Sequence, residues 1–124
     1  MKIHYSILLS AIIPISGFVC SAKNNKDCIR GEIIRITCAS TILRITTTDT
    51  LGEDRWKDSM DSVGTNYDNV FKMANKCDLP ATSKVGDIIS FRITAPKADS
   101  CMVCMMYDAP PDISYSIELC KSSE

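Results

Sequence analysis

The chain has 124 residues, of which 45% are hydrophobic and 23% are charged, and its formal net charge is −1. This near-neutral balance offers no basic surface to nucleic acid or to an anionic membrane, so neither is an expected partner. The length suits one small domain with a modest core.

Residues 1–22 have the pattern of a secretory signal peptide. An apolar run of 13 residues at 7–19 precedes the triplet CSA at 20–22, which fits a cleavage site. The run is shorter than the roughly 20 residues that a membrane-spanning helix needs, and no later apolar stretch is longer. We therefore expect a secreted or periplasmic protein with one domain at 23–124 and no transmembrane segment. A lipid anchor through Cys20 is the alternative.

Six cysteines follow the predicted signal peptide, and an even number in an exported chain indicates a disulfide framework. Six cysteines allow 15 pairings, with up to three bridges. The disulfide candidates are Cys28, Cys38, Cys77, Cys101, Cys104 and Cys120. The only histidine, His4, lies in the signal segment. The mature protein therefore lacks His-ligated zinc or copper and any His-activated nucleophile, and we expect a non-enzymatic protein.

Residues 28–48 are rich in isoleucine and threonine, which favour strands. A turn at Ala39-Ser40 would make two strands of a hairpin and place Ile36 opposite Leu43. Apolar residues on both faces at Ile33-Ile34 indicate a strongly bent strand of a barrel.

Residues 48–66 are polar and predict a long surface loop that contains the only tryptophan, Trp56. Trp56 either covers an open end of the barrel or contacts a ligand. The loop also carries a cluster of four acidic residues at 53–61 that suit either a solvated surface, a calcium site or a two-carboxylate hydrolase. They are Glu53, Asp54, Asp58 and Asp61.

The later part of the chain predicts more strands. Residues 67–77 fit either a short strand, which we favour, or a short helix. Residues 84–96 show the clearest alternation, after a turn at Gly86-Asp87. Residues 101–120 predict a terminal hairpin with its turn at 108–112.

Five or six short strands without a long helix predict an all-β fold, either a small barrel or a β-sandwich, stabilised by disulfides. The stretches "YDNVFKMAN", "LP" and "VGDIISFRI", followed by a terminal hairpin, resemble small exported bacterial OB-like domains, most of them uncharacterised. The resemblance spans about residues 28–120 and implies an OB-like barrel of five or six strands. It implies nothing specific about activity.

The stretch "CMVCMMYD" at 101–108 combines a CxxC pair with three methionines. A strand here would place Cys101 and Cys104 on opposite faces, so they would not pair with each other. A Cys101–Cys120 bridge across the hairpin is then plausible, which leaves Cys104 for one of the other three cysteines.

Methionine thioethers can bind copper(I), and strand alternation places Met102 and Met106 on one face. The competing interpretation is that these methionines fill the core. We expect a secreted binding or structural module without a cofactor, whose ligand is a protein, peptide or glycan. A copper(I)-binding protein and a small carboxylate-dependent hydrolase are the alternatives.

Overall fold

The computed structural model describes residues 27–121, so the predicted signal peptide and Cys20 lie outside the described residues. Seven strands and one 3-10 helix follow in the order β1 (Ile29–Ile36), β2 (Thr41–Ile45), β3 (Trp56–Lys57), β4 (Asn66–Tyr67), β5 (Val70–Met73), η2 (Lys76–Asp78), β6 (Ile88–Thr94) and β7 (Ser114–Leu119). No helix in this part of the chain is both long and apolar enough to cross a membrane.

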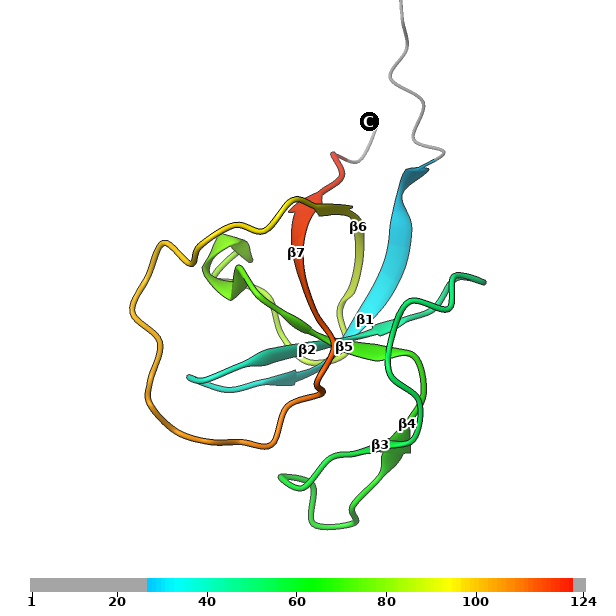
Figure 1. The fold of residues 1–124 in the computed structure, drawn as a ribbon, viewed down its shortest axis with the longest axis vertical. Helices are drawn as coiled ribbons and strands as arrows, with labels where there is room; N and C mark the ends of the chain where they lie inside the picture. The colour runs from blue at the N-terminus through cyan, green and yellow to red at the C-terminus, as the bar shows by residue number, and fades with distance from the viewer. Residues whose placement is uncertain (1–26, 122–124) are drawn as a thin grey trace, which may run out of the picture.

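Five of the strands close into a barrel in the order β1-β2-β5-β7-β6, while β3 and β4 form a separate two-stranded sheet (Figure 1). All neighbours in the barrel are antiparallel except β5 and β7, which pair in parallel. A parallel pair needs a crossover, and the chain provides it through η2 and β6. The predicted small all-β barrel is confirmed with five strands, and the alternative of a β-sandwich is wrong because the sheet closes on itself.

The first hairpin forms as predicted, but its register differs. Leu43 lies opposite Ile33, and Ile36 lies opposite Thr41. The turn is centred one residue earlier than expected. The Thr37 hydroxyl organises it by accepting hydrogen bonds from the backbone amides of Ala39 and Ser40. A bulge between Ile33 and Arg35 also shifts the pairing.

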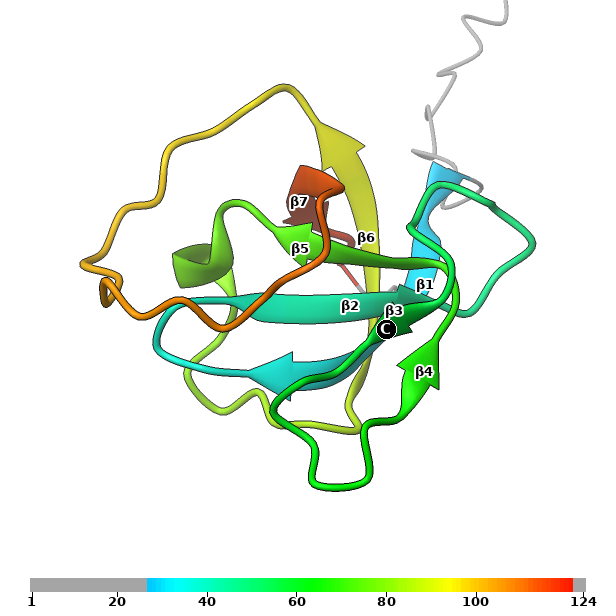
Figure 2. The same cartoon turned by 60° about the horizontal axis from the view of Figure 1, so that its bottom comes forward.

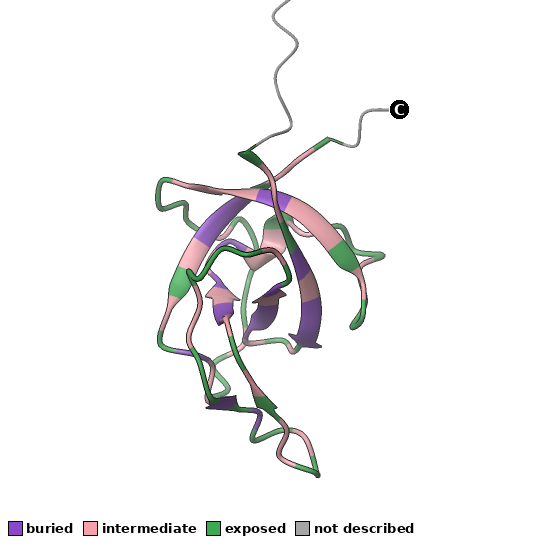
Figure 3. Ribbon diagram, turned by 90° about the vertical axis from the view of Figure 1, so that its right-hand side faces the viewer, coloured by how far each residue is buried: buried purple, intermediate pink, exposed green. Residues whose placement is uncertain are grey.

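The bulge explains the pair of isoleucines in β1. Ile33 belongs to the barrel core, whereas Ile34 belongs to a second cluster outside it. The barrel core is made by inward-facing residues of all five strands, namely Ile33, Leu43, Ile45, Phe71, Met73, Phe91 and Ile117. The Phe71 ring packs on two other rings of the core. Its centre lies 5.6 Å from the centre of the Phe91 ring and 5.4 Å from that of the Tyr115 ring. Figure 3 shows the buried segments of these strands between exposed loops.

Residues 51–69 form an arm that contains β3 and β4 and packs on the outer surface of β1, β2 and β5. Trp56, only 6% exposed, anchors the arm against Ile34, Ile42 and Val70. Trp56 therefore covers the outer wall of the barrel. The expectation that it covers an open barrel end is wrong, because the bulge leaves apolar residues on the outside for it to bury.

The ambiguous segment at 67–77 begins on the last residue of β4, contains β5 and ends within η2, so the preferred strand interpretation is confirmed. The prediction of a terminal hairpin is wrong, because its first half, residues 101–107, does not form a strand. Residues 102–111 contain no strand, helix, turn or bend. β7 pairs with β6 and β5 instead, and residues 95–113 cross the outside of the barrel as a long loop (Figure 2).

Candidate functional site: a stapled loop

All six cysteine candidates form disulfides, in the pairs Cys28–Cys120, Cys38–Cys104 and Cys77–Cys101. Cys101 and Cys104 do not pair with each other, as expected. The predicted Cys101–Cys120 bridge is wrong, because residue 101 lies on the long loop and not on a strand beside β7. Three disulfides are consistent with an extracellular or periplasmic protein.

Two of the bridges fix the long loop to different parts of the barrel. Cys101 is joined to Cys77 in η2, and Cys104 is joined to Cys38 in the β1–β2 turn. The Cys104 amide also donates to the Cys38 carbonyl at 3.3 Å. We call residues 101–108 the stapled loop.

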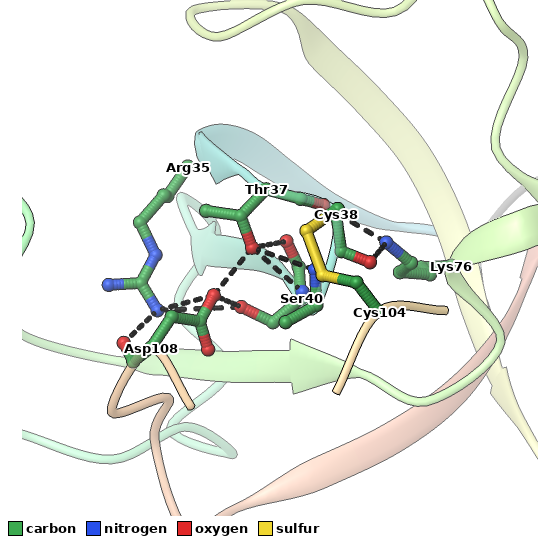
Figure 4. Close-up of a disulfide and its surroundings, with 8 residues drawn as sticks. Arg35, Thr37, Cys38, Ser40, Lys76, Cys104 and Asp108 are labelled. Atoms are coloured by element: carbon green, nitrogen blue, oxygen red, sulfur yellow. Dashed lines mark hydrogen bonds and ion pairs between the residues drawn. A yellow bond between two sulfur atoms is a disulfide. The ribbon is translucent and has the colours of Figure 1, made fainter. Parts of the chain in front are cut away.

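Asp108 holds the other end of the stapled loop. Its Oδ2 accepts hydrogen bonds from the hydroxyls of Ser40 at 2.6 Å and Thr37 at 2.5 Å, both in the β1–β2 turn (Figure 4). The Arg35 guanidinium donates to the backbone carbonyl of Asp108 at 2.8 Å. The stapled loop is therefore held by covalent bonds at one end and by a buried polar network at the other.

Arg35 is the centre of this network. It is buried, its Nη1 pairs with Asp58 Oδ1 of the arm at 2.8 Å, and its guanidinium lies 5.0 Å from the centre of the Trp56 ring. Trp56 Nε1 in turn donates to the carbonyl of Ala109 at 3.2 Å. Arg35 thus connects the arm, the β1–β2 turn and the long loop, which are distant in sequence.

The environment of Asp108 lowers its pKa below the ordinary value of 3.8. Burial acts to raise the pKa, but the hydrogen bonds from Ser40 and Thr37 and the charge of Arg35 outweigh it. A lowered pKa in the folded state means that the carboxylate contributes its stabilisation fully above pH 3.8 and loses it as the pH falls through the folded value.

We therefore expect Asp108→Asn to lower the free energy of unfolding at pH 7 by about 1–3 kcal/mol, since charge-assisted hydrogen bonds are lost. The difference from wild type should shrink as the pH falls below 3.8 and through the lower folded-state pKa of Asp108, where the folded wild-type carboxylate also becomes neutral. Urea unfolding between pH 7 and pH 2.5 measures it. The exposed Asp112→Asn is the control and should lose little stability at either pH. A difference that stays constant over this range would contradict the assignment.

Between its anchors, the stapled loop exposes apolar side chains. Met102 and Met105 are fully exposed, at 97% and 102% of the reference value, and Tyr107 is 86% exposed. Val103 and Met106 are exposed to a smaller degree. No charged residue lies between Asp99 and Asp108. The expectation that Met102 and Met106 fill the core is wrong, because they lie on a loop; copper(I) binding by them stays a prediction.

The four acidic candidates at 53–61 do not assemble into one site. Asp58 pairs with Arg35, Asp54 accepts from the amide of Asn69, and Glu53 accepts from the amide of Asp112. Asp61 accepts from Thr65, and this hydrogen bond lowers its pKa most. Within residues 27–121, no group of three or more His, Cys, Asp or Glu side chains could hold a metal ion.

One concavity of about 470 Å³ lies over β5, β6 and β7. Its apolar lining includes Met73, Ile117 and Leu119. Its charged residues Asp78 and Lys97 pair with each other at 2.6 Å, and this contact lowers the pKa of Asp78. The pair connects η2 to the long loop, so a structural role accounts for it.

Sequence reasoning missed the network of Arg35, Asp58 and Asp108. An arginine between isoleucines in a strand is a visible signal that it has a buried partner, but the sequence does not say which acidic residues provide it. Comparisons with known proteins add no identity, because no family model and no curated protein matches the chain.

Proposed function

We propose that this protein is an exported, non-enzymatic binding module and that its stapled loop is the surface that contacts a protein partner. One observation carries the proposal. A continuous, uncharged segment exposes methionine and tyrosine side chains to solvent while both of its ends are fixed to the barrel. Exposed apolar patches of this kind mark interaction sites.

The chemistry of the segment supports a protein as the ligand. Methionine and tyrosine are enriched in protein interfaces, and methionine adapts its shape to a partner. Since disulfides and Asp108 already order the loop, binding costs little conformational entropy. OB barrels that bind nucleic acids or glycans use the face of their second and third strands. Here Trp56 and the arm cover the corresponding outer face of β2 and β5.

A photo-crosslinking experiment tests the proposal. A benzophenone side chain placed at Tyr107 should form an adduct with a protein in the medium of the secreting cells, and mass spectrometry identifies that protein. Met102→Ser with Met105→Ser should reduce the adduct at least about tenfold, because two exposed anchors are removed.

Position 63 provides the matched control, because Val63 is 85% exposed on the arm and lies outside the stapled loop. A crosslinker there should give no comparable adduct. Equal labelling at positions 63 and 107, or an adduct that the two serine substitutions leave unchanged, would refute the proposed function.

A further inference from the structure

We infer that the protein bound by the stapled loop is a second copy of this chain, whose loop pairs with the first as an antiparallel strand. The inference rests on the proposed function and names its partner. It follows from the backbone of residues 102–107 and not only from their side chains.

The backbone of residues 102–107 runs without a turn or bend and has no partner. None of these six residues has a positive φ, and the first in the long loop is Ala109. Within residues 27–121, the amides and carbonyls of the exposed residues 102, 103 and 105–107 make no hydrogen bond. Such a free edge is a template for another strand. A lipid surface is a poor occupant, because hydrocarbon leaves these polar groups unsatisfied.

One edge of the segment is directed outward. The Cys104 amide points to the Cys38 carbonyl, so this edge faces the β1–β2 turn. In an extended chain, the hydrogen-bonding groups of successive residues point to opposite edges. The groups of Val103, Met105 and Tyr107 therefore point away from Cys38 and are free to pair.

This edge is complementary to itself. An antiparallel pair centred on Met105 places Met105 opposite its own copy and Val103 opposite Tyr107, an aromatic and β-branched pair of the kind that stabilises sheets. The segment is uncharged and lacks proline and glycine. A two-fold axis through Met105 uses the same surface on both copies, so the assembly closes as a dimer.

The expected dimer is weak. One pair of six-residue strands buries less than the roughly 1,200 Å² of a stable interface, so we expect exchange between monomer and dimer at roughly 10 µM to 1 mM. The net charge of −1 adds little repulsion between copies.

Sedimentation velocity on the purified, oxidised protein tests the inference. Met105→Lys and Met105→Glu should each weaken dimerisation at least about tenfold, because like charges then lie directly opposite. Mixing the two variants should restore a dimer. Val63→Lys, which adds the same charge on the arm, should dimerise as wild type does. Met105 is fully exposed, so these variants should keep the wild-type circular dichroism spectrum.

Amide exchange measured by NMR gives a second test. Raising the protein concentration should protect the amides of residues 103, 105 and 107 more than those of residues 102 and 106. A monomer at 1 mM, a dimer unaffected by Met105→Lys, or a failure of the mixed variants to associate would overturn the inference. If the crosslinker at Tyr107 then captures a different protein, the proposed function stands without self-pairing.

Discussion

Arg35→Ala is expected to lower the free energy of unfolding by about 3–5 kcal/mol, the usual cost of removing one partner from a buried ion pair. The substitution leaves the buried Asp58 carboxylate without its cation and removes the donor to the Asp108 carbonyl. It also removes the charge that lies over the Trp56 ring. The total free energy of unfolding of a domain of this size is about 5–15 kcal/mol, so the expected loss is a large fraction of its stability.

Urea unfolding followed by circular dichroism measures this loss. Arg44→Ala is the matched control, because Arg44 also pairs with a carboxylate, that of Glu32, but its side chain is 41% exposed. Exposed pairs contribute little, so this variant should lose at most about 1 kcal/mol. Similar losses of stability for the two variants would show that burial does not increase the contribution of the Arg35 network to folding.

The same substitution separates the two ways in which the stapled loop is held. Arg35→Ala weakens the anchor at Asp108 but leaves the Cys38–Cys104 bridge intact. We expect residues 105–108 to exchange their amides faster while residues near Cys104 change less. Binding through Tyr107 should weaken even in the fraction that remains folded, because ordering the loop then becomes part of the cost of binding.

Much of the barrel was predictable from local patterns. Alternation at 88–94 and the β-branched residues of 29–45 predict strands because a strand buries every second side chain. The bend at Ile33-Ile34 was also visible, since two adjacent apolar residues need two apolar surroundings. The register of the first hairpin was not predictable, because it depends on which hydroxyl accepts the hydrogen bonds of the turn.

The candidate site was much less predictable. A strand through residues 101–107 was a reasonable expectation from composition, but Cys101 and Cys104 are fixed to two separate elements that no local pattern relates to each other. Alternation therefore does not apply, and the methionines that a strand would have divided between two faces are exposed together. The sequence does not identify the partners of Arg35 for the same reason, since Asp58 and Asp108 lie 23 and 73 residues away from it.

Removal of the Cys28–Cys120 bridge by Cys28→Ala with Cys120→Ala should lower the free energy of unfolding by about 3–4 kcal/mol. The two cysteines are 92 residues apart in sequence, but the intact Cys38–Cys104 bridge shortens the loop that they close to the stretches 28–38 and 104–120, and the loss of chain entropy in the unfolded state depends on the length of that loop. The bridge also has a local role. Phe91 of β6 lies opposite both Ile29 and Leu119, so the bridge joins the two strands that flank β6 where the chain enters and leaves the barrel.

Cys77→Ala with Cys101→Ala is the informative comparison, because this bridge closes a loop of nearly the same length, 24 residues, and should also contribute about 3–4 kcal/mol. Thermal and urea unfolding in oxidising buffer measure both variants. The two should lose similar stability, but only the first should expose the amide of Cys120, which donates to Ser90 at 2.8 Å. The second should leave that amide protected but release Cys101, and with it binding by the stapled loop. Clearly unequal losses would mean that local packing, and not loop length, sets what each bridge contributes.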